Sequence, residues 1–288
     1  MIKLFKNMMD ADTRLVGINK RNIQYVYPNN PRKYFPLAND KVLSKSILEK
    51  NDVPVPETYA VIEGLWEIDK KIKLLTDKEK FVVKPAGGSG GGGILILSKS
   101  EKDRWVTPSG EIFTKQKLSN HLASILYGVY SKSDNDKVII EYCLTPHIFL
   151  KEIYDNGIPD FRIILLHNEP IMAMLRVPTE KSGGKANLHQ GAMGIGIDMK
   201  TGTLNQGFYK NKHIDHHPDS GVVFFGKKIP DWKKIVDIAI KSSKLVPLNF
   251  LGIDIIPDME KGPMVIEINA RPGLQIQNIN KTGLIQAK

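Results

Sequence analysis

The sequence predicts an α+β protein whose C-terminal half is dominated by an antiparallel sheet. Two observations support this fold class. Apolar, β-branched runs of strand length occur in pairs separated by short turns, and segments with apolar residues at helical spacing lie between these pairs. No internal repeat is visible. Such a mixture of strands and helices is typical of an α+β domain.

The N-terminal half is predicted to contain an arm, three helices and three strands. Residues 1–35 end in an Asn- and Pro-rich stretch and are expected to form an irregular arm. The first helix is expected to begin with Asn39 or Asp40 as its N-cap and to end before the two prolines of NDVPVPET. Its apolar face would carry Val42, Leu43, Ile47 and Leu48. Further helices are predicted over 65–75 and 115–130, and strands over 81–83, 94–97 and 137–144.

The C-terminal half is predicted to contain four strands and one helix. Residues 161–177 are expected to form two strands joined by a tight His-Asn-Glu-Pro turn, and residues 250–256 and 264–270 a second pair joined at PDMEKG. A helix is expected over 232–245. Residues 178–220, which are rich in Gly, Asn, His and Lys, are expected to form a long functional loop with hairpins.

Composition indicates a globular protein of the cytoplasm. Of the 288 residues, 41% are hydrophobic and 25% are charged, and no apolar run approaches the roughly 18 residues of a membrane span. The first residues lack the continuous apolar core of a signal peptide. A single cysteine, Cys143, excludes an internal disulfide framework and suits a reducing compartment.

The net charge is +10, and residues 1–50 contribute ten Lys/Arg against four Asp/Glu, or +6. Such a basic segment could meet nucleic acid, anionic lipid or an acidic protein, or could serve solubility alone. No aromatic-basic recognition motif accompanies it, so nucleic acid is not expected as a partner. No zinc-ligand spacing is present, and His213, His216 and His217 are expected to belong to a polar loop rather than to a zinc site.

The most informative motif is FVVKPAGGSGGGGILIL, residues 81–97. Its run of six glycines and one serine can bring backbone N–H groups close to an anion, and Lys84 lies where its ammonium could reach a phosphate. A dinucleotide fingerprint needs a helix after the glycines, a Walker loop ends in Gly-Lys-Ser/Thr, and a protein kinase carries its lysine on a later strand. The motif therefore predicts a hairpin lid over a nucleoside triphosphate, with a solvated flexible loop as the alternative.

Acidic side chains on two C-terminal strands form the second motif. Asp254 lies in the middle of one strand, and Glu267 and Asn269 lie two residues apart on the next, so the latter two project from one face. If the strands pair antiparallel, three oxygen donors converge in an apolar neighbourhood, where they would suit Mg²⁺ shared with substrate phosphates. The alternative is a pair of exposed polar faces. Arg271 would lie on the same side if the strand continued, and its guanidinium suits a carboxylate, a phosphate or an acyl phosphate.

Together these motifs resemble the ATP-grasp ligases, and most closely the RimK-type α-L-glutamate ligases and α-L-glutamate-ligase-like proteins. The resemblance is carried by the lysine and glycine hairpin, by EYCL (141–144) and by the D…E-x-N set, with support from GINKRN (17–22), NPRKYFPLANDKVLSK (30–45), PDFRIILL (159–166), KANLHQGA (185–192) and EINARPGL (267–274). It implies an ATP-grasp fold in which two α+β lobes with antiparallel sheets clasp the nucleotide. It also implies a basic N-terminal arm over 1–35 and an ATP-grasp domain over 36–288, divided into a lid-bearing lobe (36–143) and a metal-binding lobe (144–288).

The resemblance implies a role for each motif residue. Lys41 and Lys84 would bind the ATP phosphates, beneath a lid formed by Gly88, Ser89, Gly90, Gly91 and Gly92. Glu141, Tyr142, Cys143 and Leu144 would form the adenine hinge. Asp254, Glu267 and Asn269 would hold two Mg²⁺ ions, with Mn²⁺ as a substitute, and Arg162, Arg176 and Asn187 would face the phosphates and the carboxylate substrate. The alternatives without a function are a solvated Lys41, a Glu141 that only ends a strand, and ordinary ion pairs for Arg162 and Arg176.

The sequence departs from the RimK pattern in two places. About 35 residues precede the ATP-grasp region, where such ligases usually carry an N-terminal α/β domain. Arg271 replaces a small residue and looks more like the N-x-R of carboxylase-type ATP-grasp enzymes, so the electrophile is expected to differ from that of RimK.

The resemblance implies an ADP-forming, Mg-ATP-dependent carboxylate–amine ligase that works through an acyl phosphate and adds glutamate or another amino acid to a peptide or protein. Its partners would be a carboxylate substrate and an amine acceptor. One alternative is an ATP-binding regulatory or scaffold module without ligase activity, serving a membrane-associated partner. Another is phosphoryl transfer to a hydroxyl group.

Overall fold

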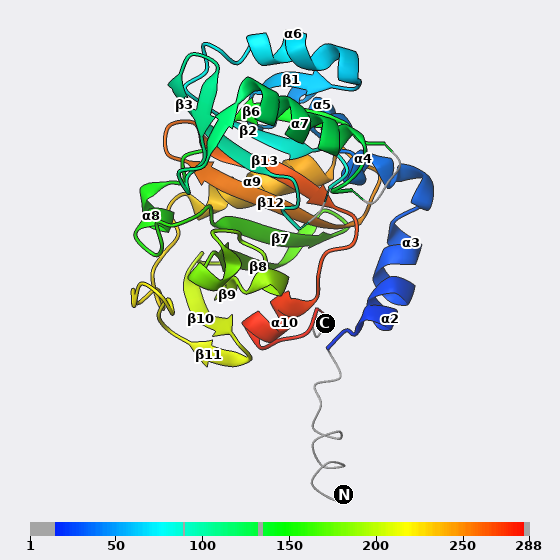
Figure 1. Ribbon diagram of the computed structural model, residues 1–288. Helices are drawn as coiled ribbons and strands as arrows, with labels where there is room; N and C mark the ends of the chain where they lie inside the picture. The colour runs from blue at the N-terminus through cyan, green and yellow to red at the C-terminus, as the bar shows by residue number, and fades with distance from the viewer. Residues whose placement is uncertain (1–14, 89, 132–134, 285–288) are drawn as a thin grey trace, which may run out of the picture. The chain divides into compact units, whose positions relative to one another are not determined.

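The computed structural model describes residues 15–88, 90–131 and 135–284 (Figure 1). These residues form two compact units. Residues 39–145 make up the first, here termed the middle unit, and the chain before and after them makes up the second, here termed the flanking unit. Each unit combines helices with an antiparallel sheet, which confirms the predicted α+β class.

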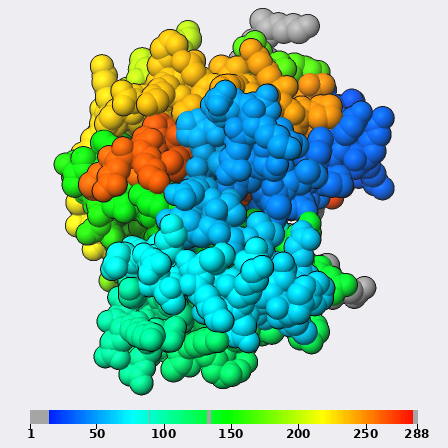
Figure 2. Space-filling view, turned by 90° about the horizontal axis from the view of Figure 1, so that it is seen from above, coloured from blue at the N-terminus to red at the C-terminus, as the bar shows by residue number. Residues whose placement is uncertain are grey.

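The middle unit contains a six-stranded sheet in the order β1-β6-β2-β3-β4-β5. Its strands are β1 (Thr58–Ile62), β2 (Lys80–Pro85), β3 (Leu95–Glu101), β4 (Arg104–Val106), β5 (Ile112–Thr114) and β6 (Val138–Tyr142). Its helices are α5 (Lys41–Lys50), the 3₁₀ turn η3 (Leu65–Glu67), α6 (Ile68–Lys73) and α7 (Lys115–Leu126), and the short α4 (Pro36–Asn39) precedes them. The segment with η3 and α6 lies on the outside of this unit (Figures 1 and 2). Apolar side chains of the sheet, α6 and α7 form one buried core.

Helix α5 begins where the sequence predicts. The Asp40 carboxylate accepts hydrogen bonds from the N–H groups of Val42 (2.9 Å) and Leu43 (3.2 Å), which is the expected N-cap. The predicted apolar face is wrong in part, because Leu43 is 38% exposed whereas Lys45 is only 8% exposed. A lysine can be buried here because its ammonium has a carboxylate partner, described below.

The flanking unit contains a seven-stranded antiparallel sheet in the order β11-β10-β9-β8-β7-β12-β13. Its strands are β7 (Asp160–Leu166), β8 (Glu169–Val177), β9 (Met193–Ile197), β10 (Leu204–Tyr209), β11 (Lys212–Ile214), β12 (Phe250–Asp258) and β13 (Gly262–Asn269). The helical elements after residue 145 are α8 (Ile148–Lys151), η4 (Glu180–Ser182), η5 (Leu188–Gln190), α9 (Trp232–Ser243) and α10 (Gln275–Asn280).

Both predicted strand pairs of this unit are present. Strands β7 and β8 are joined at His167 and Asn168, and β12 pairs antiparallel with β13. The long loop with hairpins expected over 178–220 is wrong in part. The hairpins are present, but their strands β9, β10 and β11 extend the sheet. The many glycines there disguised strand β9, whose residues are all buried. Helix α10 was not expected because it follows the strand-breaking Pro272-Gly273 pair.

The irregular conformation expected before residue 35 is wrong for the part that the structure describes. Residues 18–29 form a helix made of α2 (Ile18–Lys20), a π-helical segment η1 (Arg21–Val26) and α3 (Tyr27–Asn29), and the 3₁₀ turn η2 (Arg32–Tyr34) follows. Val26 is buried in the core of the flanking unit, and Asn30 is 1% exposed. Its side chain bonds the backbone of Phe250 and the carbonyl of Ala270, so tertiary contacts override the Asn- and Pro-rich composition. Residues 1–14 of the predicted arm lie outside the described residues.

Across the described ranges, no helix combines the length and the apolar character that a membrane span requires.

Candidate functional site

The glycine hairpin forms as the sequence predicts. Strands β2 and β3 pair antiparallel, and the loop between them places Gly90, Gly91 and Gly93 at φ values of 69°, 76° and 73°, which favour glycine. Side chains from the same unit hold this loop. Lys41 Nζ donates to the Gly88 carbonyl (2.6 Å), and the Gly87 N–H donates to Asp136 Oδ1 (2.9 Å). Ser89 of the predicted lid lies outside the described residues.

Directly before this loop lies a buried cluster of Lys45, Lys84 and Glu141, here termed the lysine triad. Glu141 Oε2 contacts Lys45 Nζ at 2.6 Å, and Glu141 Oε1 contacts Lys84 Nζ at 2.5 Å. The three residues are between 5% and 8% exposed. Two ammonium groups and one carboxylate leave a charge of +1 in a place with little access to water. Such a charge is costly unless an anion joins it.

The pKa shifts within the lysine triad agree with this charge balance. Burial alone would raise the pKa of Glu141, but Lys84 and Lys45 outweigh it and the net shift is downward. The pKa of Lys45 is lowered, first by burial and also by the neighbouring Lys84, although Glu141 opposes the shift. An added anion would offset the repulsion between the Lys45 and Lys84 ammonium groups.

Sequence reasoning missed Lys45, although a signal was present. Lys45 lies four residues after Lys41 on α5, so the two lysines share one side of the helix. At the proposed adenine hinge, the Glu141 carboxylate is occupied by lysines, and the Tyr142 N–H donates to the Glu57 carbonyl (2.8 Å). Cys143 and Leu144, which complete that predicted segment, are buried.

A second buried cluster, here termed the arginine network, crosses three strands of the flanking unit. The register sets Arg162 of β7 opposite Asp254 of β12, and Asp160 of β7 opposite Arg176 of β8. Arg162 donates from Nε to Asp254 Oδ1 (2.7 Å) and from Nη2 to Asp254 Oδ2 (2.6 Å). Arg176 donates to both oxygens of Asp160 and, from Nη2, to Asp254 Oδ2 (2.7 Å). Two guanidinium groups and two carboxylates thus balance each other.

The pKa values of the two aspartates of this network are shifted in opposite directions. Burial would raise the pKa of Asp254, but Arg162 and Arg176 outweigh it and lower the pKa to about 2. Burial and the nearby Asp254 raise the pKa of Asp160 to about 6, against the pull of Arg176. The pKa of Arg176 is raised because Asp160 and Asp254 together outweigh its burial.

The structure brings together the three side chains of the proposed metal set. Asp254 lies opposite Glu267 in the register of β12 and β13. Asn269 Nδ2 lies 3.3 Å from Asp254 Oδ2 and 3.5 Å from Glu267 Oε2. These hard oxygen donors are of the kind that Mg²⁺ prefers. Both Asp254 oxygens are engaged by guanidinium groups, however, so Asp254 would have to release one of them before it could serve as a ligand.

Among the described residues, no group of three or more His, Cys, Asp or Glu side chains is placed to hold a metal ion. The three histidines considered for a zinc site, His213, His216 and His217, contact different partners. His217 is buried and bonds the Pro178 carbonyl, His216 contacts Asp215, and the ring of His213 lies beside that of Phe208.

Arg271 and Asn187 make contacts other than those of the arginine network. Strand β13 ends at Asn269, so Arg271 does not continue it. The Arg271 guanidinium instead lies 4.9 Å from the centre of the Phe35 ring. Asn187 begins the turn η5, where its side-chain oxygen accepts from the His189 N–H (3.0 Å).

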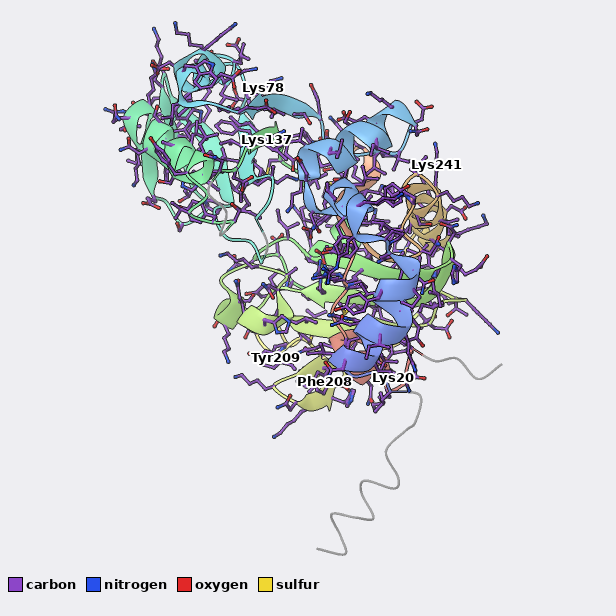
Figure 3. The ribbon with its side chains drawn as sticks, turned by 90° about the vertical axis from the view of Figure 1, so that its right-hand side faces the viewer. Lys20, Lys78, Lys137, Phe208, Tyr209 and Lys241 are labelled. Atoms are coloured by element: carbon purple, nitrogen blue, oxygen red, sulfur yellow. The ribbon has the colours of Figure 1, made fainter. Side chains whose placement is uncertain are left out.

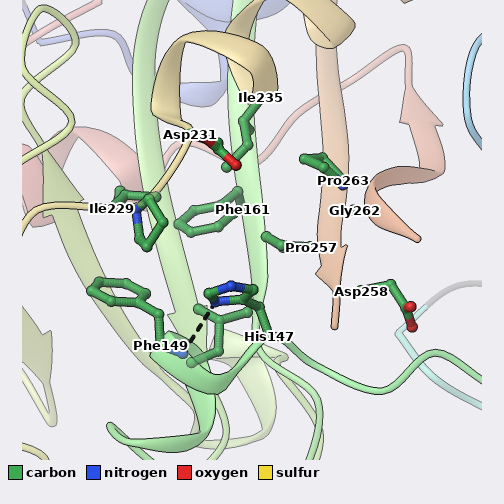
Figure 4. A pocket seen from close by; sticks show the side chains of 12 residues that line it. His147, Phe149, Phe161, Ile229, Asp231, Ile235, Pro257, Asp258, Gly262 and Pro263 are labelled. Carbon is green, nitrogen blue, oxygen red and sulfur yellow. Dashed lines mark hydrogen bonds between the residues drawn. The ribbon is translucent and has the colours of Figure 1, made fainter. Parts of the chain in front are cut away.

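A small cavity of about 40 Å³ lies elsewhere in the flanking unit (Figure 4). It is lined by side chains from α8, the start of α9 and the turn between β12 and β13, including His147, Phe161, Asp231 and Pro263. A cavity of this volume holds a few water molecules and is too small for a nucleotide.

Comparison with known proteins agrees with this architecture. Biotin carboxylase from Campylobacter jejuni is 12% identical over 91% of this chain and 46% of its own chain, with a TM-score of 0.58. Phosphoribosylamine–glycine ligase from Thermotoga maritima is 15% identical over 93% and 57%, with a TM-score of 0.53. D-cycloserine synthetase DcsG is 15% identical over 86% and 67%, with a TM-score of 0.49. The chain therefore spans about half to two thirds of the length of these structures. The likeness to the first two confirms the predicted ATP-grasp fold.

No curated protein matches the sequence. Residues 20–288 match the sequence profile of one family, described as Sugar-transfer associated ATP-grasp. That match includes the glycine hairpin, the lysine triad and the arginine network. The chain belongs to the sugar-transfer associated ATP-grasp family.

Proposed function

We propose that the chain is an ADP-forming, Mg-ATP-dependent carboxylate–amine ligase. The observation that carries this proposal is the lysine triad beside the glycine hairpin, because a buried excess of positive charge at the foot of a glycine loop is suited to a polyphosphate. The family match supports ATP as the nucleotide.

The middle unit would bind the nucleotide. Lys84 and Lys45 would contact phosphate oxygens with the ammonium hydrogens that Glu141 does not use. Lys41 would join them after releasing the Gly88 carbonyl, which would also free the hairpin to close over the phosphates. The backbone of residues 142–144 remains the proposed adenine contact, since the Glu141 carboxylate is engaged by lysines.

The flanking unit would bind the acid and the metal. Glu267 and Asn269 would hold magnesium, and Asp254 would be a third ligand after one of its oxygens releases a guanidinium group. Magnesium would supply neutralisation of the phosphate charge. The arginine released in that exchange would then face the substrate carboxylate or the transferred phosphoryl group. This exchange gives Arg162 and Arg176 a role beyond neutralising Asp254.

The proposed reaction needs no protein nucleophile. A carboxylate oxygen of the acid attacks the γ-phosphorus of ATP, the bond to the β-phosphate oxygen breaks, and ADP leaves. The amine then attacks the acyl carbon, an amide bond forms, and phosphate departs with the former carboxylate oxygen. The amine proton passes to phosphate or solvent. Positioning and charge stabilisation by the lysines and arginines account for the chemistry.

The acid and the amine are proposed by class. The resemblance to RimK-type ligases supports glutamate or another amino acid as the acid, joined to a peptide or protein amine. Because the family description mentions sugar transfer, we include amino sugars among the acceptors to be assayed. One of the similar structures is, by its name, a ligase of phosphoribosylamine and glycine, which supports amino acids as a first set of acids.

The test is ADP release by the purified chain with Mg-ATP and pairs of amino acids, acidic peptides and amino sugars, with mass spectrometry of the products. The proposal predicts ADP only when an acid and an amine are both present, together with an amide. A stable phosphorylated hydroxyl product without an amide would instead identify a kinase. Glu267→Gln should lower turnover strongly, and full turnover in that variant with the true substrates would contradict the proposed metal role.

A second candidate function is an ATP-binding module without ligase activity. The observation that favours it is Asp254, whose oxygens are engaged by two arginines. In this case the chain would bind Mg-ATP but would form no ADP with any pair of substrates.

A further inference from the structure

The N-terminal helix and the residues that follow it, up to Phe35, contact one short segment of the flanking unit, residues 270–272, in three places. Asn30 Nδ2 donates to the Ala270 carbonyl (2.9 Å), and Arg21 Nη1 donates to the Pro272 carbonyl (3.2 Å). Between them, Arg271 lies over the ring of Phe35. Figure 3 shows this helix along the flanking unit, with Lys20, the residue before Arg21, labelled near its beginning.

The Arg21 contact brings its guanidinium group to the backbone directly after Arg271. Arg21 is held by Pro272, the residue that follows Arg271, and by Asn22, whose side-chain oxygen accepts from Arg21 Nε (3.2 Å) and Nη2 (3.0 Å). A guanidinium has five N–H donors, and three of those of Arg21 are used in this way, which leaves two. Arg271 is exposed on one side and stacked on Phe35 on the other.

The charge of this pair is not balanced by a carboxylate. Among the described residues, neither Arg21 nor Arg271 forms an ion pair with an Asp or Glu, whereas Arg162 and Arg176 each form at least one. Burial lowers the pKa of Arg21, and the nearby positive charge of Arg271 lowers it further. Two neighbouring guanidinium groups without a carboxylate partner are suited to binding an oxyanion.

We propose that Arg21 and Arg271 form a binding site for an anionic group of the substrate, a carboxylate or a phosphate, and that the N-terminal helix thereby takes part in substrate binding. The role in catalysis rests on the proposed ligase function, because Arg271 lies two residues after Asn269 of the proposed metal set. Anion binding at the pair is a separate claim that can be measured without turnover.

A structural role for Arg21 alone predicts a different pattern. If Arg21 only tied the helix to Pro272, its loss would lower stability and would leave anion binding unchanged. An anion site requires both arginines, so the loss of either one must weaken binding to a similar extent. Arg21→Lys keeps one positive charge but loses the two-donor geometry of guanidinium, and it should lie between the wild type and Arg21→Gln.

The experiment is isothermal titration of the full chain with inorganic phosphate in one arm and succinate in the other. Both arms contain saturating magnesium and a non-hydrolysable ATP analogue, so that phosphate cannot occupy the nucleotide's own phosphate positions. The variants are Arg21→Gln, Arg21→Lys, Arg271→Gln and the double variant Arg21→Gln/Arg271→Gln. The matched control is Lys33→Gln, which removes an exposed charge from the same N-terminal segment. Circular dichroism and thermal melting check that each variant is folded.

We expect at least a tenfold loss of affinity in each single arginine variant, little further loss in the double variant, and no change in Lys33→Gln. The arm that binds more tightly identifies the anion as phosphate or carboxylate. Wild-type affinity in folded Arg21→Gln overturns the proposal, and so does the absence of saturable binding of both probes to the wild type. Failure of the ligase proposal would instead appear as no ADP formation in the substrate screen, whatever the titration shows.

If turnover is found, Arg21→Gln should raise the KM of the anionic substrate and leave the KM of ATP unchanged. An unchanged KM for every substrate would contradict the role of Arg21 in substrate binding and leave the ligase function intact.

Discussion

The lysine triad and the arginine network are both buried charge clusters on antiparallel sheets, but their charges differ. In the triad, two lysines share one glutamate, whereas in the network, two arginines meet two aspartates. In a balanced cluster every charge has a partner of opposite sign, and removal of one member leaves a buried charge without a partner. An unbalanced cluster carries an excess charge that a ligand of opposite sign can neutralise. This difference supports the proposal that the triad binds an anionic ligand, whereas the network stabilises the fold.

The largest effect on stability is expected for Asp254→Asn. This change leaves two buried guanidinium groups with Asp160 as their remaining carboxylate, and breaking a buried ion pair from one side costs about 3–5 kcal/mol. Chemical denaturation measures the free energy of unfolding. The control is Asp237→Asn on α9, whose carboxylate is exposed and pairs with Lys233, with an expected loss below about 0.5 kcal/mol. Equal losses of stability in the two variants would contradict the role of the arginine network in the fold.

Lys84→Met tests the other side of the comparison. With one lysine removed, Glu141 keeps Lys45 and the triad becomes balanced, so stability should change little. The kcat/KM for ATP should fall by roughly 10²–10³-fold, as for loss of one group that stabilises transition-state charge. Lys80→Met, an exposed position on the same strand, is the control for the ADP assay. Severe unfolding with normal activity in the molecules that remain folded would reverse the assignment.

The two aspartates of the network lose their contributions to stability in different pH ranges. The pKa of Asp160 is raised to about 6, so its stabilising contribution is complete below about pH 3.8 and is lost as the pH rises through 6. The pKa of Asp254 is lowered to about 2, so its contribution is present above about pH 3.8 and is lost as the pH falls through 2. Between pH 4 and 7 the titration of Asp160 should therefore dominate within the network.

The measurement is the free energy of unfolding of the wild type and of Asp160→Asn at several pH values between 4 and 7. At about 1.36 kcal/mol for each pKa unit, the difference between the two proteins should change by roughly 3 kcal/mol at most across this range, with the wild type losing relative stability as the pH rises. A difference that stays constant with pH would show that Asp160 is ionised throughout.

The smallest effect is expected for Lys45→Met. Loss of one charged hydrogen-bond donor should weaken ATP binding by roughly tenfold, and stability should be nearly unchanged because Lys84 still pairs with Glu141. Titration with ATP measures the affinity, and Lys50→Met at the exposed end of α5 is the control. Unchanged affinity in Lys45→Met would restrict the phosphate contacts to Lys41 and Lys84.

The sequence predicts those parts of the fold that depend on local pattern. The β2–β3 hairpin, the Asp40 cap and the approach of Asp254 to Glu267 follow from alternation, capping chemistry and a short turn. The burial of Lys45 and the helix over residues 18–29 do not follow, because both depend on contacts with residues far away in the chain. Lys45 needs Glu141, and the helix is anchored by Asn30 on Phe250.

The arginine network shows the same limit at the site itself. Arg162 and Arg176 were predicted to face substrate groups, and the alternative was ordinary ion pairing. Only the strand register reveals that each lies within reach of a buried aspartate. Two arginines on neighbouring strands give no local signal of which carboxylate they meet. The identity of their partners could therefore not be predicted from the sequence.

The most direct test of the ligase proposal follows one oxygen atom. With the acid substrate labelled with ¹⁸O in its carboxylate, an acyl phosphate route transfers one labelled oxygen to the released phosphate, which mass spectrometry detects. We expect one ¹⁸O in each phosphate formed together with amide, and loss of both products in Lys84→Met. Unlabelled phosphate accompanying amide formation would contradict attack of the carboxylate on ATP.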